Sequence, residues 1–80
     1  MPNKDTHLIQ MIRDIAANLS PGKSEQEAAE AIAGHIKKFW APPMRHKITE
    51  LWQDDPDQYV KDPNYANTDR AIILLKEQLQ

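Results

Sequence analysis

The chain has 80 residues, no cysteine and a formal net charge of −2. A chain of this length buries only about 60% of its unfolded surface, so we expect one domain over residues 1–80, supported by its own core or by a partner. The lack of cysteine excludes disulfides and thiolate metal sites. The slightly acidic charge argues against a nucleic-acid binder, which is usually basic.

The N-terminal residues 1–5 lack the positively charged region followed by an apolar region that marks a signal peptide, so we expect none. No apolar stretch approaches the roughly 20 residues that a membrane span needs. We therefore expect a cytoplasmic protein without membrane contact.

The first predicted helix covers residues 6–19. Its apolar side chains recur at three- and four-residue spacing, which is typical of an amphipathic helix, and they are Leu8, Ile12, Ile15, Ala16 and Leu19. Pro21 and Gly22 follow in a segment that favours a turn. This pattern predicts that the helix buries one face.

The second predicted helix covers residues 24–40. Ser24 and Glu27 form a capping-box pattern, in which the side chain of each residue bonds the backbone N–H of the other. An apolar stripe follows, consisting of Ala28, Ile32, Ile36 and Phe39 and widened on one side by Ala29, Ala33 and Trp40. The pair Pro42-Pro43 ends the helix because proline cannot continue the hydrogen-bond ladder.

The angular position of each residue around the helix axis separates those expected in the core from those expected at its rim. We expect Ile32, Ile36 and Phe39 to lie in the core and Trp40 to lie at its rim. Gly34 falls on the polar side, where glycine costs roughly 1 kcal/mol relative to alanine. Either another backbone approaches closely there or the cost is simply tolerated.

The third predicted helix covers residues 43–53. Pro43 is suited to its first position and sets the corner between two helices. One face carries Met44, Ile48, Leu51 and Trp52. An irregular acidic stretch follows from residue 54 to residue 67, and we expect Tyr59 and Val60 to dock it on the core.

The fourth predicted helix covers residues 68–79, after a cap at Asn67-Thr68-Asp69. Its stripe is formed by Ala71, Ile72, Leu75 and Leu79. Ile73 and Leu74 fall outside this stripe, so this helix is either more enclosed than the others or turned towards a partner or a second copy. The predicted fold is an all-α, single-domain bundle of three to four helices with an irregular acidic loop before the last.

We expect no catalytic, cofactor-binding or metal site. His7, His35 and His46 lack the spacing of a helical zinc pair, and the aspartates at 54, 55 and 57 lack the calcium-loop pattern. Gly22 and Gly34 are isolated, so they form no phosphate-binding loop. The residues that stand out suit protein contact instead.

Aromatic residues, methionine and arginine are enriched where proteins bind one another. The candidate partner-binding residues are Lys38, Trp40, Pro42, Met44 and Arg45, and the candidate structural residues beside them are Ile32, Ile36, Phe39 and Pro43. Four cations also cluster here, namely Lys37, Lys38, Arg45 and Lys47. They are a solvated helix end, ion-pair donors to an acidic partner, or a weak phosphate contact, which ranks last.

With these residues in view, the chain resembles the delta subunit of NAD-dependent formate dehydrogenase. The resemblance is strongest over residues 32–45, where the family has Ile-Ala-x-His, a basic helix end and Phe-Trp-x-Pro-Arg-Met-Arg. A weaker match covers residues 8–17. Pro43 stands where the family usually has arginine, and the acidic stretch after Trp52 replaces a glycine-containing turn.

The resemblance implies a non-catalytic accessory subunit that binds no cofactor of its own. In such molybdenum or tungsten enzymes the larger subunits carry the pterin, iron–sulfur clusters and flavin. The implied partner is the large subunit, and the implied role is assembly, stability or cofactor insertion. The alternative is a self-associating helical module unrelated to formate metabolism, with a weak homo-oligomer as its product.

Overall fold

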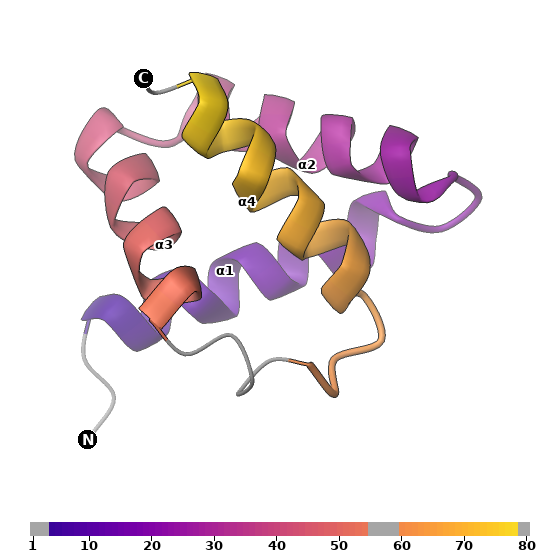
Figure 1. Ribbon diagram of the computed structural model, residues 1–80, viewed down its shortest axis with the longest axis horizontal. Coiled ribbons are helices and arrows are strands. Elements are labelled where there is room, and N and C mark those ends of the chain that lie inside the picture. The colour runs from indigo at the N-terminus through magenta and orange to yellow at the C-terminus, as the bar shows by residue number, and fades with distance from the viewer. Residues whose placement is uncertain (1–3, 55–59, 79–80) are drawn as a thin grey trace.

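The computed structural model describes residues 4–54 and 60–78 of the chain. Four helices account for most of them: α1 (Lys4–Leu19), α2 (Glu25–Phe39), α3 (Pro42–Asp54) and α4 (Tyr65–Gln78). Over these two ranges no strand occurs, so the predicted all-α fold is confirmed. Figure 1 shows the four helices in order of colour, with α4 crossing the front of the molecule.

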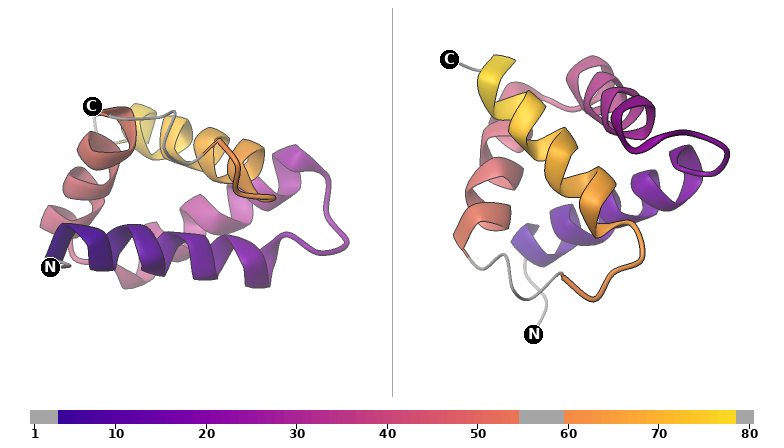
Figure 2. Two further views of the ribbon diagram at one scale, coloured as in Figure 1. Left: turned by 90° about the horizontal axis from the view of Figure 1, so that it is seen from below. Right: turned by 45° about the vertical axis from the view of Figure 1, so that its right-hand side comes forward.

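α4 packs mainly against α2 and also against α3, although α2 and α4 are far apart in the sequence. Figure 2 shows α1 and α4 on opposite sides of the molecule, with α3 closing one end. The core lies between these helices. No helix in the described ranges is long and apolar enough to cross a membrane.

The predicted apolar face of α1 is confirmed. Leu8, Ile12 and Ala16 are buried, and Ile15 and Leu19 pack against the core from its edge. The buried face is wider than predicted because it also includes Ile9.

The start of α2 follows the predicted capping box. The Ser24 hydroxyl accepts a hydrogen bond from the Glu27 backbone N–H at 3.2 Å, and the Ser24 N–H donates to the Glu27 carboxylate at 3.4 Å. These bonds satisfy two backbone donors that the first turn leaves open. The helix itself begins at Glu25, one residue after the predicted start.

The end of α2 reverses the predicted roles of its two aromatic residues. Phe39 is 64% exposed and Trp40 only 6%, so the placement of Phe39 in the core and Trp40 at the rim is wrong. The reason is local: Trp40 is the C-cap and has an extended backbone (φ −91°, ψ 143°). Its side chain therefore leaves the direction that the helix imposes and turns into the core, which Ile32 and Ile36 share as predicted.

α3 begins at Pro42, one residue before the predicted start. Ala41 precedes it, and its carbonyl accepts from the N–H groups of Met44 and Arg45 at 2.9 and 3.2 Å. Both prolines thus lie in the first turn, where the missing N–H costs no hydrogen bond. Ile48 and Trp52 are buried, with Met44 and Leu51 packed beside them, as predicted.

α4 begins at Tyr65, three residues before the predicted start, so the expected cap at residues 67–69 is wrong. The capping contacts come earlier: the Asp62 carboxylate accepts from the Asn64 N–H at 2.7 Å, and the Asn64 carbonyl accepts from the Thr68 N–H at 2.9 Å. Because aspartate readily bonds the backbone two residues on, Asp62 sets the helix start.

Asp62, in the described part of the segment before α4, is tied to α1 by an ion pair. Arg13 on α1 donates to the Asp62 carboxylate at 2.6 Å, and the Asp62 side chain is only 10% exposed. Val60 is 54% exposed, so its predicted docking on the core is wrong. The other predicted docking residue, Tyr59, lies outside the described residues.

The buried face of α4 contains the predicted Ala71, Ile72 and Leu75; Leu79 lies outside the residues whose side chains are described. Ile73 is 47% exposed and Leu74 is half-buried. Of the two readings left open for this helix, the structure favours the one in which an apolar side chain is turned outwards.

Candidate interaction surface

The end of α2 presents an exposed aromatic side chain flanked by two basic residues. The rings of His35 and Phe39 lie with centroids 4.8 Å apart and tilted by 46°. The Lys38 ammonium lies 5.5 Å from the centroid of the Phe39 ring, within the range of a cation–π contact. We call His35, Lys38 and Phe39 the Phe39 surface.

The predicted partner-binding residues divide into surface and core. Lys38 and Pro42 are exposed, as is the predicted structural residue Pro43. Met44 is half-buried and packs against the core, and Trp40 is buried in it. The aromatic side chain available to a partner is therefore Phe39, which the sequence pattern had placed inside.

Arg45 has a contact within the chain. Its Nη1 donates to the backbone carbonyl of Lys37 at 3.5 Å, so it lies at the C-terminal end of α2. A cation there is favoured by the helix dipole. The Arg45 Nε is buried without a hydrogen-bond partner. The Arg45 side chain thus contributes to the corner between α2 and α3 through its bond to the Lys37 carbonyl.

The described part of the chain contains no cluster of side chains suited to bind a metal ion. No three residues among its His, Asp and Glu are grouped so as to hold an ion. His7 and His46 are exposed and His35 packs on Phe39. Asp54 is exposed, whereas Asp55 and Asp57 lie outside the described residues.

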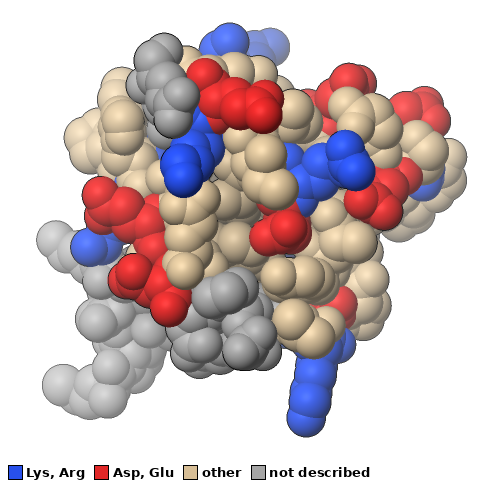
Figure 3. All heavy atoms as spheres, in the orientation of Figure 1, with Lys and Arg blue, Asp and Glu red and all other residues tan. Residues whose placement is uncertain are grey.

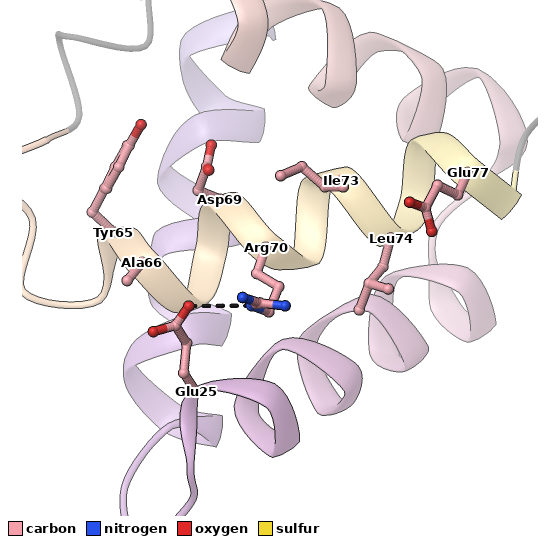
Figure 4. Close-up of a pocket in the computed structure, with 8 residues that line it drawn as sticks. All are labelled: Glu25, Tyr65, Ala66, Asp69, Arg70, Ile73, Leu74 and Glu77. Atoms are coloured by element: carbon pink, nitrogen blue, oxygen red, sulfur yellow. Dashed lines mark hydrogen bonds and ion pairs between the residues drawn. The ribbon is translucent and has the colours of Figure 1, made fainter.

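A second surface feature lies along α4. A hollow of about 370 Å³ is lined by eight residues: Glu25, Tyr65, Ala66, Asp69, Arg70, Ile73, Leu74 and Glu77. Figure 4 shows Tyr65, Asp69 and Ile73 on one side of α4 and Leu74 on the side nearer α2. We call this feature the α4 hollow.

Hydrogen bonds connect the walls of the α4 hollow to the rest of the fold. Arg70 donates to Glu25 and to Gln26, both at 3.1 Å, which ties α4 to the start of α2. The Trp52 indole N–H donates to Asp69 at 3.0 Å, and the Trp52 ring stacks on Tyr65 with centroids 5.8 Å apart. Sequence reasoning missed this site; its one sequence signal was the off-stripe pair Ile73 and Leu74.

Gly34 lies on the exposed side of α2, and a Cβ built there meets nothing within 4 Å. No backbone of the described chain approaches it, so a close approach within this part of the chain does not explain the glycine, while approach of a partner's backbone and simple tolerance stay open. We predict that Gly34→Ala stabilises the isolated chain by about 0.5–1 kcal/mol, because alanine loses less backbone entropy in a helix. Thermal unfolding followed by circular dichroism measures the gain.

The other glycine supplies the matched control for this prediction. Gly22 also has open space around it but has a φ of +78°, a left-handed conformation that alanine adopts at a cost. Gly22→Ala is therefore expected to lower the melting temperature while Gly34→Ala raises it. A loss of stability in Gly34→Ala would contradict the prediction.

The described residues define a small all-α bundle with an exposed aromatic and basic surface at one helix end and an acidic, partly apolar hollow along its last helix. The family model described as NADH-dependent formate dehydrogenase delta subunit FdsD matches residues 7–63. The chain belongs to this family.

The match covers nearly all of α1, the whole of α2 and α3, and the Phe39 surface, and it ends before α4. It also extends past Trp52 into the acidic stretch. No curated protein and no solved structure matches the chain.

Proposed function

We propose that the chain is a non-catalytic accessory subunit of a cytoplasmic NAD-dependent molybdenum or tungsten formate dehydrogenase. It binds the large subunit and supports assembly, stability or cofactor insertion there. Family membership supports the choice of enzyme complex. The absence of a reactive cluster from the described residues is compatible with this role and carries none of the argument.

The observation that carries the docking model is the exposure of Phe39. A phenylalanine that is 64% exposed is costly to leave in water, and burying it against a partner would recover apolar contact area. The ring contacts both His35 and Lys38, and these contacts restrict its side chain before binding, so less freedom is lost when a partner covers it. Residues of this kind often act as interface anchors.

The charges around Phe39 indicate the chemistry of its partner. Lys37 and Lys38 are exposed at the end of α2, and Arg45 lies beside them. Basic groups around an apolar anchor favour a partner surface that has a pocket with an acidic rim, since opposite potentials speed and orient docking. The docking contacts proposed here are Phe39, Lys38 and Pro42, with Trp40 and Met44 supporting them from the core.

Co-purification tests this model. The full chain is co-expressed with a tagged formate dehydrogenase large subunit, and the retained amount is compared between the natural chain and Phe39→Ala. We expect retention to fall about tenfold or more, as for truncation of an interface anchor. Val60→Ala is the matched control. Among the described residues outside α4, Val60 is the most exposed large apolar side chain after Phe39.

The two variants separate docking from folding. Each removes an exposed side chain, so both should fold as the natural chain does by circular dichroism. Equal retention of both variants would refute the docking model. The role is then resolved by measuring the pterin and metal content of the large subunit, and its inactivation rate, with and without the chain.

A further inference from the structure

The side chains of the α4 hollow form two parallel rows on one helix. Tyr65, Asp69, Ile73 and Glu77 follow one another at four-residue spacing, and so do Ala66, Arg70 and Leu74. Rows at this spacing are the ridges of a helix surface, and the groove between them is where a second helix places its own ridge. The hollow therefore has the shape that suits a helix.

The lining of the hollow mixes apolar and acidic side chains: Ile73 lies between Asp69 and Glu77 in one row of α4, and Glu25 adds a carboxylate from α2. Ile73 and Leu74 lie in adjacent rows, and Ile73 is 47% exposed. The charged lining consists of three carboxylates and one guanidinium, and that guanidinium, on Arg70, already pairs with Glu25. Figure 3 shows uncharged surface on the face that α4 crosses, interrupted by acidic groups and by basic ones.

We propose that the α4 hollow binds a basic amphipathic helix of a partner protein. An apolar ridge of that helix covers Ile73 and Leu74. Its lysines or arginines face Asp69 and Glu77, the two carboxylates of the lining that do not pair with Arg70. This inference goes beyond the proposed function: it concerns α4, which lies outside the family match, and it does not use the Phe39 surface.

Charge decides against a second copy of this chain as the occupant. Pairing two α4 hollows face to face would bring six carboxylates together against two guanidiniums, since each copy contributes three and one. Like charges across an interface are unfavourable. A helix of opposite charge meets the same apolar surface without that cost.

The test uses the full chain and a synthetic peptide of about 15 residues, with leucines at helical spacing and lysines elsewhere. The readout is the NMR signal of the Trp52 indole N–H, which bonds Asp69 in the wall of the hollow. The backbone amides of Ala17 and Asn18 on α1 are the internal reference, because both residues are exposed and α1 lies on the opposite side of the molecule from α4 (Figure 2). We expect the peptide to shift the Trp52 signal and to leave these amide signals in place.

Two substitutions in the hollow are compared with two matched substitutions outside it. Ile73→Ala and Glu77→Lys are expected to weaken peptide binding about fivefold or more, because they remove the apolar contact and reverse a charge. Glu50→Lys makes the same charge reversal, and Val60→Ala a similar truncation, at exposed positions elsewhere; both are expected to leave binding within about twofold.

Specific results would overturn the proposal. One is equal binding of a peptide in which glutamate replaces every lysine; another is unchanged binding by Ile73→Ala. Sedimentation of the chain alone gives the remaining check, and we expect a monomer. A dimer that Ile73→Ala abolishes would identify a second copy as the occupant and refute the basic helix. None of these results depends on formate dehydrogenase, so this proposal can fail while the proposed function stands.

Discussion

Replacing Trp40 by alanine is expected to lower the free energy of unfolding by about 3–5 kcal/mol, whereas replacing its neighbour Phe39 is expected to change it by at most about 0.5 kcal/mol. Small domains have total stabilities near the low end of about 5–15 kcal/mol. Trp40→Ala is therefore expected to leave much of the population unfolded at room temperature.

The contrast follows from burial. The Trp40 side chain is 6% exposed and belongs to the core cluster that includes Ile36 and Ile48. Its removal leaves a cavity that the corner between α2 and α3 fills only in part, because Pro42 and Pro43 restrict the backbone there. Phe39 is 64% exposed, so its removal takes little surface out of contact.

Urea unfolding followed by far-ultraviolet circular dichroism measures both effects. Trp40→Phe provides the intermediate case, because it keeps an aromatic ring in the core. We expect the order of stability to be natural chain, then Trp40→Phe, then Trp40→Ala. A larger loss in Phe39→Ala than in Trp40→Ala would restore the arrangement that the sequence pattern suggested.

The helix faces were predictable because they depend on local spacing. The stripe in α1 and the capping box of Ser24 and Glu27 appear in the structure as expected. Both are set by residues within a few positions of each other, and their geometry is the same in any helix.

The reversal of Phe39 and Trp40 shows where periodicity stops being informative. Helical position placed Phe39 in the apolar stripe of α2 and Trp40 at its flank, and the structure reverses that order. The decision is made by the C-cap, where Trp40 adopts an extended backbone and turns inward. Sequence reasoning thus located the aromatic pair at this corner but exchanged its buried and exposed members.

The α4 hollow depends on contacts between distant residues. Arg70 pairs with Glu25, and Arg13 pairs with Asp62, across 45 and 49 positions. Charge pairs of this separation leave no trace in local spacing. The α4 start was missed for a related reason, because Asp62 sets it within a segment that the sequence marks only as acidic and rich in proline.

Trp52 connects α3, which the family match covers, to α4, which the match does not cover. Its side chain is 1% exposed, and its indole N–H donates to Asp69 on α4 at 3.0 Å. We predict that Trp52→Phe lowers the free energy of unfolding by about 1–3 kcal/mol, because phenylalanine fills most of the volume but cannot donate to the carboxylate. Trp52→Ala is expected to cost about 3–5 kcal/mol.

A double-mutant cycle isolates the contribution of this hydrogen bond. Trp52→Phe, Asp69→Ala and the double variant are unfolded in urea, and we expect the effects to be non-additive by about 1 kcal/mol or more. Additive effects would show that the bond contributes nothing. Hydrogen exchange then locates the loss: if Trp52 holds α4 on the bundle, amides of α4 lose more protection in Trp52→Phe than those of α1, whereas uniform loss would mean that the four helices unfold as one unit.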